Sequence, residues 1–223
     1  MIYLTGDKHG DRSFFESSQD SELHPGDFLI ICGDFGYLFG DTPREHQFLD
    51  WLEAEKPYTI LFVDGNHENF DALAGYPVDT WHGGQIHRLR RNILHLMRGQ
   101  VFTIEGRTFF TMGGGYSRDR KTRIKNLSYW DAELPSAEEY AEALANLYAH
   151  NNTVDYIISH TIPTSIIPLL GRTPDPHEEE LNRFFETLLH TVTFKHWWAG
   201  HWHQNNPVTP KLTVLYYKLQ RLV

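Results

Sequence analysis

Five short polar motifs contain Asp, Asn and His residues of the kinds that bind metal ions. In chain order they are Gly6-Asp7-Lys8-His9-Gly10, Gly33-Asp34-Phe35-Gly36, Gly65-Asn66-His67-Glu68, Ser159-His160 and Gly200-His201-Trp202-His203. Carboxylate and amide oxygens with imidazole nitrogens, and no thiolate, favour Mn, Fe, Zn, Mg or Ni over a structural zinc site built from cysteines. A single Asp-x-His or His-x-His pair is weak evidence, because most histidines lie on the surface or in satisfied core positions. Five such motifs in one chain indicate a metal-dependent active site.

The motifs follow short apolar runs that we interpret as buried strands. The runs are Ile2–Thr5, Phe28–Cys32, Thr59–Val63, Tyr156–Ile158 and His196–Ala199. In open α/β sheets, ligand sites form beyond the carboxyl ends of the strands, where loops from distant parts of the chain converge. Glycines in the motifs permit the tight turns that bring short side chains together. We therefore expect the five motifs to meet at one site.

Three segments with helical periodicity begin with recognisable start signals. Thr42-Pro43-Arg44-Glu45 combines an N-cap, a Pro at the first helical position and a Glu placed for a capping box. Ser136-Ala137-Glu138-Glu139 is a second capping box, and Asp175-Pro176-His177-Glu178 predicts the start of a third helix. Helices thus alternate with strands at both ends of the chain. This pattern predicts mixed α and β layers around a sheet core.

The middle of the chain and its last residues predict further strands. Three runs of alternating polarity predict an antiparallel meander: Ile93–Met97, Gln100–Ile104 and Arg107–Met112. Glu105-Gly106 supplies a tight turn between the last two runs. Leu212–Leu219 predicts a terminal strand.

The size and the charge of the chain limit the classes of function. A length of 223 residues predicts one domain, 1–223. The net charge is −9, and the 20 Lys and Arg residues are scattered apart from a cluster between Arg118 and Lys125, so no footprint of a dedicated nucleic-acid binder is present. The first residues form neither a signal peptide nor a membrane span, which predicts a cytoplasmic protein. Cys32 is the single cysteine and is expected in the core, and nothing in the sequence specifies an oligomeric state.

The ordered set Gly-Asp-x-His-Gly, Gly-Asp, Gly-Asn-His-Glu, Ser-His and Gly-His-x-His resembles the motifs of the calcineurin-like metallophosphoesterase family. The matched motifs span residues 6–203, nearly the whole chain. The resemblance implies a metallophosphatase-like α/β fold, a four-layer α/β/β/α sandwich with two packed sheets. It also implies a hydrolase that binds two divalent metal ions, with Mn favoured and Fe, Zn, Ni or Mg as alternatives.

The same resemblance implies a role for each motif residue. The implied ligands are Asp7, His9 and His203 for the first ion, Asn66, His160 and His201 for the second, and Asp34 as the bridge between them. Asn66 would also lie beside the substrate, and His67 matches the histidine that contacts the phosphoryl oxygens or the leaving group. Two cations would lower the pKa of a bridging water, so we expect a metal-bridging hydroxide to hydrolyse phosphomonoesters or phosphodiesters. Asp34 and His67 are then the catalytic residues, and His67 as imidazolium could stabilise or protonate the departing oxygen.

The second motif departs from that of the relatives that dephosphorylate proteins. Those relatives carry Gly-Asp-x-Val-Asp-Arg-Gly, whereas residues 33–39 have neither the second Asp nor the Arg. This departure weakens a Ser/Thr protein phosphatase-like activity, which remains an alternative beside a non-catalytic metal-binding scaffold. It also leaves His67 without its usual carboxylate partner. Asp41 or Glu68 could orient His67 instead, or Asp41 could simply precede the Thr42 helix.

Residues Gly113–Arg120 follow the predicted meander and begin the basic cluster. They resemble the Gly-Gly-x-Tyr-Ser-x-Asp stretch of small bacterial and phage members of the family. One interpretation places this loop beside the metals, with Arg118, Arg120 or Arg123 contacting substrate phosphate. The other is a glycine-permitted turn with solvated charges. The fold does not specify the substrate, but the acidic net charge favours a small or nucleotide-like molecule over a long polyanion.

The remaining histidines and the tryptophans near the last motif are expected in structural positions. Trp197, Trp198 and Trp202 are predicted to pack in the core, with stacking of Trp202 on a substrate ring as the alternative. The histidines treated as structural or surface residues are His24, His46, His82, His87, His95, His150, His177, His190 and His196.

Overall fold

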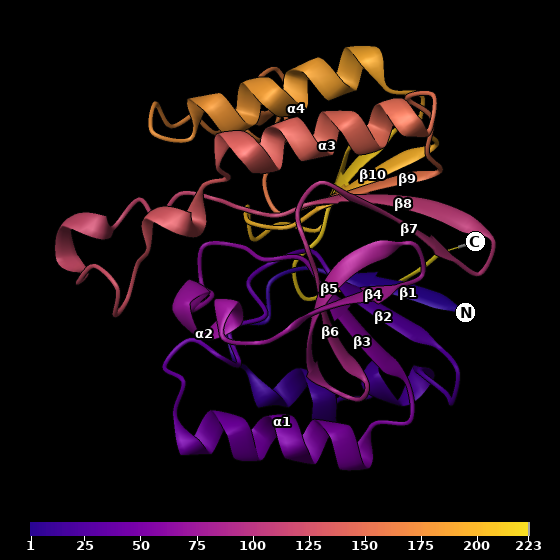
Figure 1. Ribbon diagram of the computed structural model, residues 1–223, viewed down its shortest axis with the longest axis vertical. Helices are drawn as coiled ribbons and strands as arrows, with labels where there is room; N and C mark the ends of the chain where they lie inside the picture. Colours follow the sequence, from indigo (N-terminus) through magenta and orange to yellow (C-terminus); the bar gives the residue numbers. More distant parts are fainter. Residues whose placement is uncertain (223) are drawn as a thin grey trace.

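The computed structural model describes residues 1–222 and arranges them in four layers (Figure 1). Helix α1 lies below a first sheet in Figure 1, and a second sheet lies between that sheet and helices α3 and α4. The longer helices are α1 (Pro43–Glu55), α3 (Ala137–Ala149) and α4 (Glu179–Thr191). The short helices are α2 (Phe70–Ala74), η1 (Arg12–Glu16), η2 (Asp20–Glu22), η3 (Arg120–Thr122), η4 (Asp131–Glu133) and η5 (Ile167–Leu170). The order α/β/β/α is that of the predicted metallophosphatase-like fold.

The first sheet has seven strands and a parallel centre. In spatial order the strands are β13 (Gln220–Arg221), β1 (Ile2–Thr5), β2 (Phe28–Ile31), β3 (Thr59–Phe62), β6 (Ile93–Leu96), β5 (Gly84–Arg90) and β4 (Val78–Trp81). Strands β1, β2, β3 and β6 are parallel to one another. Strand β13 pairs antiparallel with β1, β5 pairs antiparallel with β6, and β4 pairs antiparallel with β5. The parallel strands therefore end at one edge of the sheet, which is where the first three polar motifs begin.

The second sheet has six strands and is also parallel at its centre. In spatial order the strands are β11 (Asn206–Thr209), β12 (Leu212–Val214), β10 (His196–Ala199), β9 (Tyr156–Ser159), β8 (Arg107–Met112) and β7 (Gln100–Ile104). Strands β12, β10, β9 and β8 are parallel, and β11 and β7 form antiparallel edges. The five runs predicted as strands before the motifs are confirmed as β1, β2, β3, β9 and β10, with ends within one residue.

The core lies in three apolar clusters that separate the four layers. Between the sheets, Ile2, Leu4 and Ile30 of the first sheet belong to one cluster with Phe109 and Ile158 of the second. A second cluster lies under α1, and a third lies under α3 and α4. Burial of each such side chain contributes about 1.5–3 kcal/mol. Strands covered on both faces have continuous apolar sequences, which is why they were visible as uninterrupted runs.

The first two predicted helix starts are confirmed. The Oγ1 of Thr42 accepts the N–H of Glu45, whose carboxylate accepts the N–H of Thr42, and Ser136 and Glu139 make the same reciprocal pair at α3. Each capping box satisfies two backbone donors that the first turn of a helix leaves free. Within residues 1–222, no helix combines the length and the apolar character needed to cross a bilayer.

The third predicted helix start is wrong by three residues, because the N-cap is Glu178 instead of Asp175 and α4 begins at Glu179. The carboxylate of Asp175 accepts the N–H of His177, and the carbonyl of Asp175 accepts the N–H of Glu178. These contacts form a turn instead of the first helical turn. The displacement leaves Glu178 buried before the helix rather than inside it.

The predicted meander is wrong in its first strand. Strands β7 and β8 form a hairpin through Glu105-Gly106, as expected, but β6 lies in the first sheet, where Ile93 pairs with Ile60 of β3. Gly99 has a φ of 72°, and this left-handed conformation lies between β6 in one sheet and β7 in the other. Alternation of polarity shows that a segment is extended but does not specify its neighbour.

One hairpin was not predicted, and the last predicted strand differs from the structure. Strands β4 and β5 are joined by His82-Gly83, with φ values of 50° and 97°, a two-residue turn with positive φ at both positions. The predicted strand Leu212–Leu219 is wrong, since β12 ends at Val214 in the second sheet and β13 begins at Gln220 in the first. Between them, the carbonyl of Tyr216 accepts the N–H of Gly6, so this segment links the two sheets beside the first motif.

Candidate metal centre

The five polar motifs meet at the carboxyl ends of strands from both sheets. The first three follow β1, β2 and β3 of the first sheet, and the last two follow β9 and β10 of the second. Backbone hydrogen bonds join the motifs directly. The N–H groups of Lys8 and His9 donate to the carbonyl of Asp34, and that of Gly200 donates to the carbonyl of His160. The site is therefore built at the junction of the two sheets.

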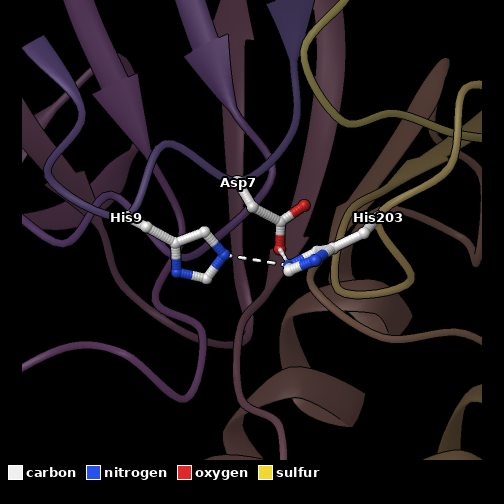
Figure 2. Close-up of side chains that lie close together, drawn as sticks. All are labelled: Asp7, His9 and His203. Carbon is white, nitrogen blue, oxygen red and sulfur yellow. Dashed lines mark hydrogen bonds and ion pairs between the residues drawn. The ribbon is translucent and has the colours of Figure 1, made fainter.

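Asp7, His9 and His203 form a first group of side chains (Figure 2). The Nε2 atoms of His9 and His203 are 2.9 Å apart, and Nε2 of His203 is 4.0 Å from Oδ1 of Asp7. One potential ligand atom from each residue lies within 4.8 Å of the other two. The imidazole of His203 stacks on the ring of Tyr216 with 4.5 Å between centroids, which restricts its orientation.

Asn66, His160 and His201 form a second group. The Nε2 of His160 is 3.2 Å from Oδ1 of Asn66 and 3.1 Å from Nδ1 of His201. Asn66 and His160 are buried, and His201 is partly exposed. Three donor atoms of the kinds that bind divalent cations thus converge from three different loops.

Asp34 lies between the two groups. Its Oδ1 is 3.4 Å from Nε2 of His160, and its Oδ2 is 3.7 Å from Nε2 of His9. The same Oδ1 also accepts the backbone N–H of His67 at 2.8 Å. Each oxygen of this buried carboxylate therefore faces a different group of potential ligands.

Hydrogen bonds outside the cluster fix the direction of several side chains. The Nδ1 of His160 donates to the carbonyl of Cys32 at 2.9 Å, which leaves Nε2 facing the cluster. The Nδ2 of Asn66 donates to Oγ of Ser117 at 3.2 Å, so that Oδ1 of Asn66 faces the cluster. The N–H of His201 donates to both oxygens of Asp7, at 2.9 and 3.1 Å. Partners of this kind orient metal ligands and set their tautomers.

Burial and neighbouring charges shift the pKa values of these residues in opposite directions. Burial raises the pKa of Asp7 to about 7, although the charge of His160 opposes the shift. Burial also acts to raise the pKa of Asp34, but the charge and hydrogen bond of His160, together with the charges of His67 and His9, outweigh it and hold that pKa below its usual range. For His160 itself, burial lowers the pKa, and the carboxylates of Asp34 and Asp7 raise it to about 10.

The cluster thus has buried carboxylates that require a positive charge nearby. It also has two pairs of imidazole nitrogens that face each other, 2.9 Å apart in His9 and His203 and 3.1 Å apart in His160 and His201. Divalent cations satisfy both requirements, because they neutralise carboxylates and accept lone pairs from neutral imidazoles. The donor set therefore fits bound metal ions.

Several non-glycine residues of the motifs have left-handed backbone conformations, which residues with a Cβ rarely adopt. Four residues of the cluster have positive φ: His9 (49°), Asp34 (50°), His201 (66°) and His203 (49°). Left-handed backbone at such residues costs about 1–2 kcal/mol each. Gly65 is needed for a different reason, since a Cβ there would lie 2.2 Å from Oδ1 of Asp34. Strained conformations of this kind gather at functional sites.

His67 contacts an arginine rather than either predicted carboxylate. The Nη2 of Arg123 is 3.3 Å from Nε2 of His67. Asp41 interacts with His46, and the carboxylate of Glu68 accepts backbone N–H groups of the second and third motifs. Burial lowers the pKa of His67, and the charge of Arg123 acts in the same direction while Asp34 opposes it.

The three arginines considered as substrate ligands occupy different positions. Arg123 lies beside His67. Arg120 donates to the buried carboxylate of Glu133 at 2.9 Å, which holds the loop itself. Arg118 is exposed, lies 3.5 Å from the carboxylate of Asp175 and stacks over the ring of Trp202. Arg123 therefore contacts a predicted catalytic side chain, His67, whereas Arg118 contacts Trp202 of the last motif and Arg120 contacts Glu133.

Several supporting residues were not predicted. Ser117 accepts from Asn66 and donates to Glu133 at 3.0 Å, so Glu133 supports Asn66 through Ser117. Glu178 accepts the N–H of Tyr116, and its Oε1 lies 3.6 Å from Nε2 of His201. Ser117 belongs to the glycine-rich segment already singled out, but no spacing in the sequence pointed to the two glutamates.

The expected core positions agree with the structure. Trp197, Trp198 and Trp202 are buried in apolar clusters or among buried residues, and Cys32 is buried between the sheets. Among the remaining histidines, His95 is the buried one and lies 3.1 Å from the carboxylate of Asp64.

A comparison with protein families gives one match over most of the chain. The family model described as calcineurin-like phosphoesterase matches residues 1–205. No curated protein and no solved structure gave a match.

Proposed function

Since the chain belongs to the calcineurin-like phosphoesterase family, and its members are metal-dependent hydrolases of phosphoric esters, we propose that two divalent ions bind at the junction of the sheets. The proposed ligands are Asp7, His9 and His203 for one ion, Asn66, His160 and His201 for the other, and Asp34 for both. The position of Asp34 is the observation that carries this proposal. Its two oxygens lie 3.4 Å from His160 and 3.7 Å from His9, so one carboxylate reaches both groups.

We propose Mn as the native metal, with Fe, Zn, Ni or Mg as alternatives. The donor set of carboxylate, amide and imidazole groups supports this group of metals, because it contains no thiolate. When bound, such ions lower the pKa of a water between them and neutralise the phosphoryl oxygens of the substrate.

The residues around the ions have separate tasks in the proposed reaction. Asp34 and the two ligand groups hold the ions at a fixed spacing. Arg123 donates hydrogen bonds to a phosphoryl oxygen, since its guanidinium carries donors and no acceptor. His67 contacts the phosphoryl group or the leaving oxygen from the same side, because its Nε2 is within 3.3 Å of Nη2 of Arg123. A phosphoryl oxygen that contacts one of these side chains is therefore within reach of the other.

We also propose that residues 1–223 form one domain and that the substrate is small or nucleotide-like. The pairing of β13 with β1 supports one domain, since it joins the two ends of the chain in one sheet. The net charge of −9 supports a small substrate, because a long polyanion would meet repulsion over much of the surface.

Hydrolysis of nitrophenyl phosphate and bis-nitrophenyl phosphate by protein reconstituted with Mn²⁺ tests the proposal. We expect kcat/KM to fall by more than about 100-fold in Asp34→Asn and in His160→Ala, because each removes a metal ligand. His190→Ala is the matched control, since His190 is exposed on α4 and contacts Glu186. Metal-loaded protein that hydrolyses neither ester would contradict the proposal.

A further inference from the structure

A pocket of about 690 Å³ opens beside His67, between η1 and the start of α1. Its volume lies within the range of about 300–1,000 Å³ that small-molecule sites occupy. We call it the α1 pocket. The lining residues used below are His9, His67, Arg12, Phe39, Arg44 and Phe48.

Two arginines and one carboxylate line the α1 pocket. Arg44 is exposed and makes no ion pair within residues 1–222, and Arg12 uses its Nε for Glu16 but leaves its terminal nitrogens available. The one carboxylate in the lining, Glu45, already accepts hydrogen bonds from the N–H and the Oγ1 of Thr42. The pocket is therefore suited to an anionic group, and Arg44 is free to bind it.

The same pocket has aromatic walls. The ring of Phe39 is partly exposed, with its centroid 5.8 Å from that of His67. On the other wall, Phe48 stacks on Tyr37 with 4.7 Å between centroids and on Trp51 with 5.2 Å. These two rings and the guanidinium of Arg12, 5.5 Å from the centroid, pack against Phe48 and hold it in a fixed position. The partly exposed ring of Phe39 is therefore the wall that can pack against a planar ring such as a nucleobase.

The position of the α1 pocket relates it to the leaving group. His9, a proposed ligand of the first ion, and His67 line it, whereas Arg44 and Phe48 belong to α1. The α1 pocket, with its cationic and aromatic walls, therefore adjoins the place where a phosphoryl group at the ions would lie. Nitrophenyl phosphate has a ring but no second phosphate, so it can use only part of this space.

We propose that the α1 pocket binds a leaving group that is itself a nucleoside phosphate. This inference rests on the proposed function, because it requires the phosphoryl group to lie at the ions. The second phosphate contacts Arg44 and Arg12, and the base packs against the partly exposed ring of Phe39. The oxygen of water forms a bond to phosphorus, and the bond from phosphorus to the bridging oxygen breaks. That oxygen keeps the electron pair and takes up a proton from the water, which gives inorganic phosphate and the free nucleoside phosphate.

Three non-hydrolysable probes separate the contributions of ring and phosphate. Adenosine 5′-methylenediphosphonate has both, methylenediphosphonate lacks the nucleoside, and phenylphosphonate lacks the second phosphonate. Calorimetry with Mn²⁺-loaded protein should give the first probe a dissociation constant at least about tenfold lower than either of the others. Equal binding of all three probes would overturn the proposal.

Variants of the pocket test the residues. Arg44→Ala should weaken the nucleoside probe and methylenediphosphonate by about tenfold, because both have the second phosphonate. Phe39→Leu should weaken the nucleoside probe more than methylenediphosphonate, because only the former has a base. Arg183→Ala is the control for Arg44→Ala, since Arg183 is an exposed arginine on α4 that pairs with Glu179. If neither pocket variant changes binding of the nucleoside probe, the α1 pocket does not hold the leaving group.

Hydrolysis assays show whether the nucleoside phosphate leaves from an ester or from an anhydride. In adenosine 3′,5′-bisphosphate it is joined to the transferred phosphoryl group by an ester bond, and in adenosine diphosphate by an anhydride bond. At least one of these two compounds should be hydrolysed with a higher kcat/KM than nitrophenyl phosphate. If nitrophenyl phosphate is the best substrate of the three, the pocket assignment fails while the proposed function stands. If only bis-nitrophenyl phosphate is hydrolysed, the pocket assignment likewise fails while the proposed function stands. If none of the three compounds and no bis-nitrophenyl phosphate is hydrolysed, the proposed function itself fails.

Discussion

The Nη2 of Arg123 lies 3.3 Å from Nε2 of His67, although 56 positions separate the two residues in the chain. Arginine has no acceptor, so in this structure Nε2 of His67 accepts the contact and the ring proton lies on Nδ1. For Nε2 of His67 to donate to a phosphoryl or leaving oxygen, as proposed above, it must gain a proton and Arg123 must turn to the substrate oxygen instead. The Nε of Arg123 in turn pairs with Asp119 at 2.7 Å. The second motif has neither the Asp nor the Arg found in protein phosphatases, and the loop after β8 places both residue types beside His67 instead.

Replacing Arg123 should impair hydrolysis more than folding. In Arg123→Gln we expect kcat/KM for nitrophenyl phosphate to fall by about 10- to 100-fold, because the phosphoryl oxygens lose a charged donor. Lys125→Gln is the matched control, since it removes a positive charge from the same loop at an exposed pair with Asp131. Equal activities of the two variants would show that Arg123 does not contact substrate.

Ser117 should act on metal affinity through Asn66. In Ser117→Ala the Nδ2 of Asn66 loses its acceptor, so the amide can turn and present nitrogen to the ion. We expect metal affinity to fall by about 10- to 100-fold in a calorimetric titration, the usual cost of losing such a partner. Ser21→Ala, at an exposed serine of η2, should titrate like the wild type. Unchanged affinity in Ser117→Ala would show that Asn66 needs no support from Ser117.

A methyl group at Gly65 should disrupt the centre directly. The Cβ of Gly65→Ala would lie 2.2 Å from Oδ1 of Asp34 and 2.8 Å from Nε2 of His160, so both side chains must move. We expect loss of metal binding in a protein that still shows the circular dichroism of the wild type. Gly106→Ala is the control, because a Cβ there meets nothing within 4 Å and only the left-handed backbone of the hairpin turn is affected. A Gly65→Ala protein that retains its metal would rule out the close packing described above.

Asp155 should make stability depend on pH at the end of the second sheet opposite the motifs. Burial acts to raise its pKa, but hydrogen bonds from Lys195 and Thr108 outweigh burial and hold the pKa below its usual value. A lowered folded-state pKa contributes stability above about pH 4 that is lost as the pH falls. The free energy of unfolding in urea should thus be about 1–2 kcal/mol lower for Asp155→Asn at pH 7, with the difference shrinking toward pH 3.

The control for Asp155→Asn is a substitution of an exposed aspartate, with the free energy of unfolding measured over the same pH range. Asp131→Asn removes a carboxylate that pairs with Lys125 at the surface, so its curve should follow that of the wild type at every pH. A difference between Asp155→Asn and wild type that stays constant from pH 7 to pH 3 would assign its effect to packing rather than charge.

Removal of metal should lower the melting temperature. Ions that bind only the folded chain at about 100 times their dissociation constant add about 2.7 kcal/mol, which corresponds to about 5–10 °C for a chain of this size. Chelation with EDTA should abolish that increment, and Asp34→Asn should show little change on addition of Mn²⁺. Identical melting curves with Mn²⁺ and with EDTA would mean that no ion is bound by the folded protein.

The sequence predicted those elements that have local signals. The parallel strands before the motifs were visible because both of their faces are buried, and the caps at Thr42 and Ser136 were visible because each is complete within four residues. The same reasoning placed β6 in the wrong sheet. Its parallel neighbour, β3, ends at Phe62, and no local pattern connects the two segments.

The supporting residues of the site could not be predicted for a similar reason. The contacts of Ser117 with Asn66 and of Arg123 with His67 depend on the path of an irregular loop through η3. From the sequence alone, each of the three arginines of that loop could have been the one that contacts substrate phosphate. Only the fold shows that Arg120 turns inward to Glu133 while Arg123 lies beside His67.

The contact between His9 and His203 brings together two positions that are far apart along the polypeptide. The two residues are 194 positions apart, so an ion held by both would be a reversible cross-link across nearly the entire chain. Closing so long a loop has a large entropic cost in the unfolded ensemble, and that cost increases only slowly with length. In the native fold the two imidazoles already lie together. A backbone cut in an exposed loop between them would therefore leave two fragments that the ion continues to hold.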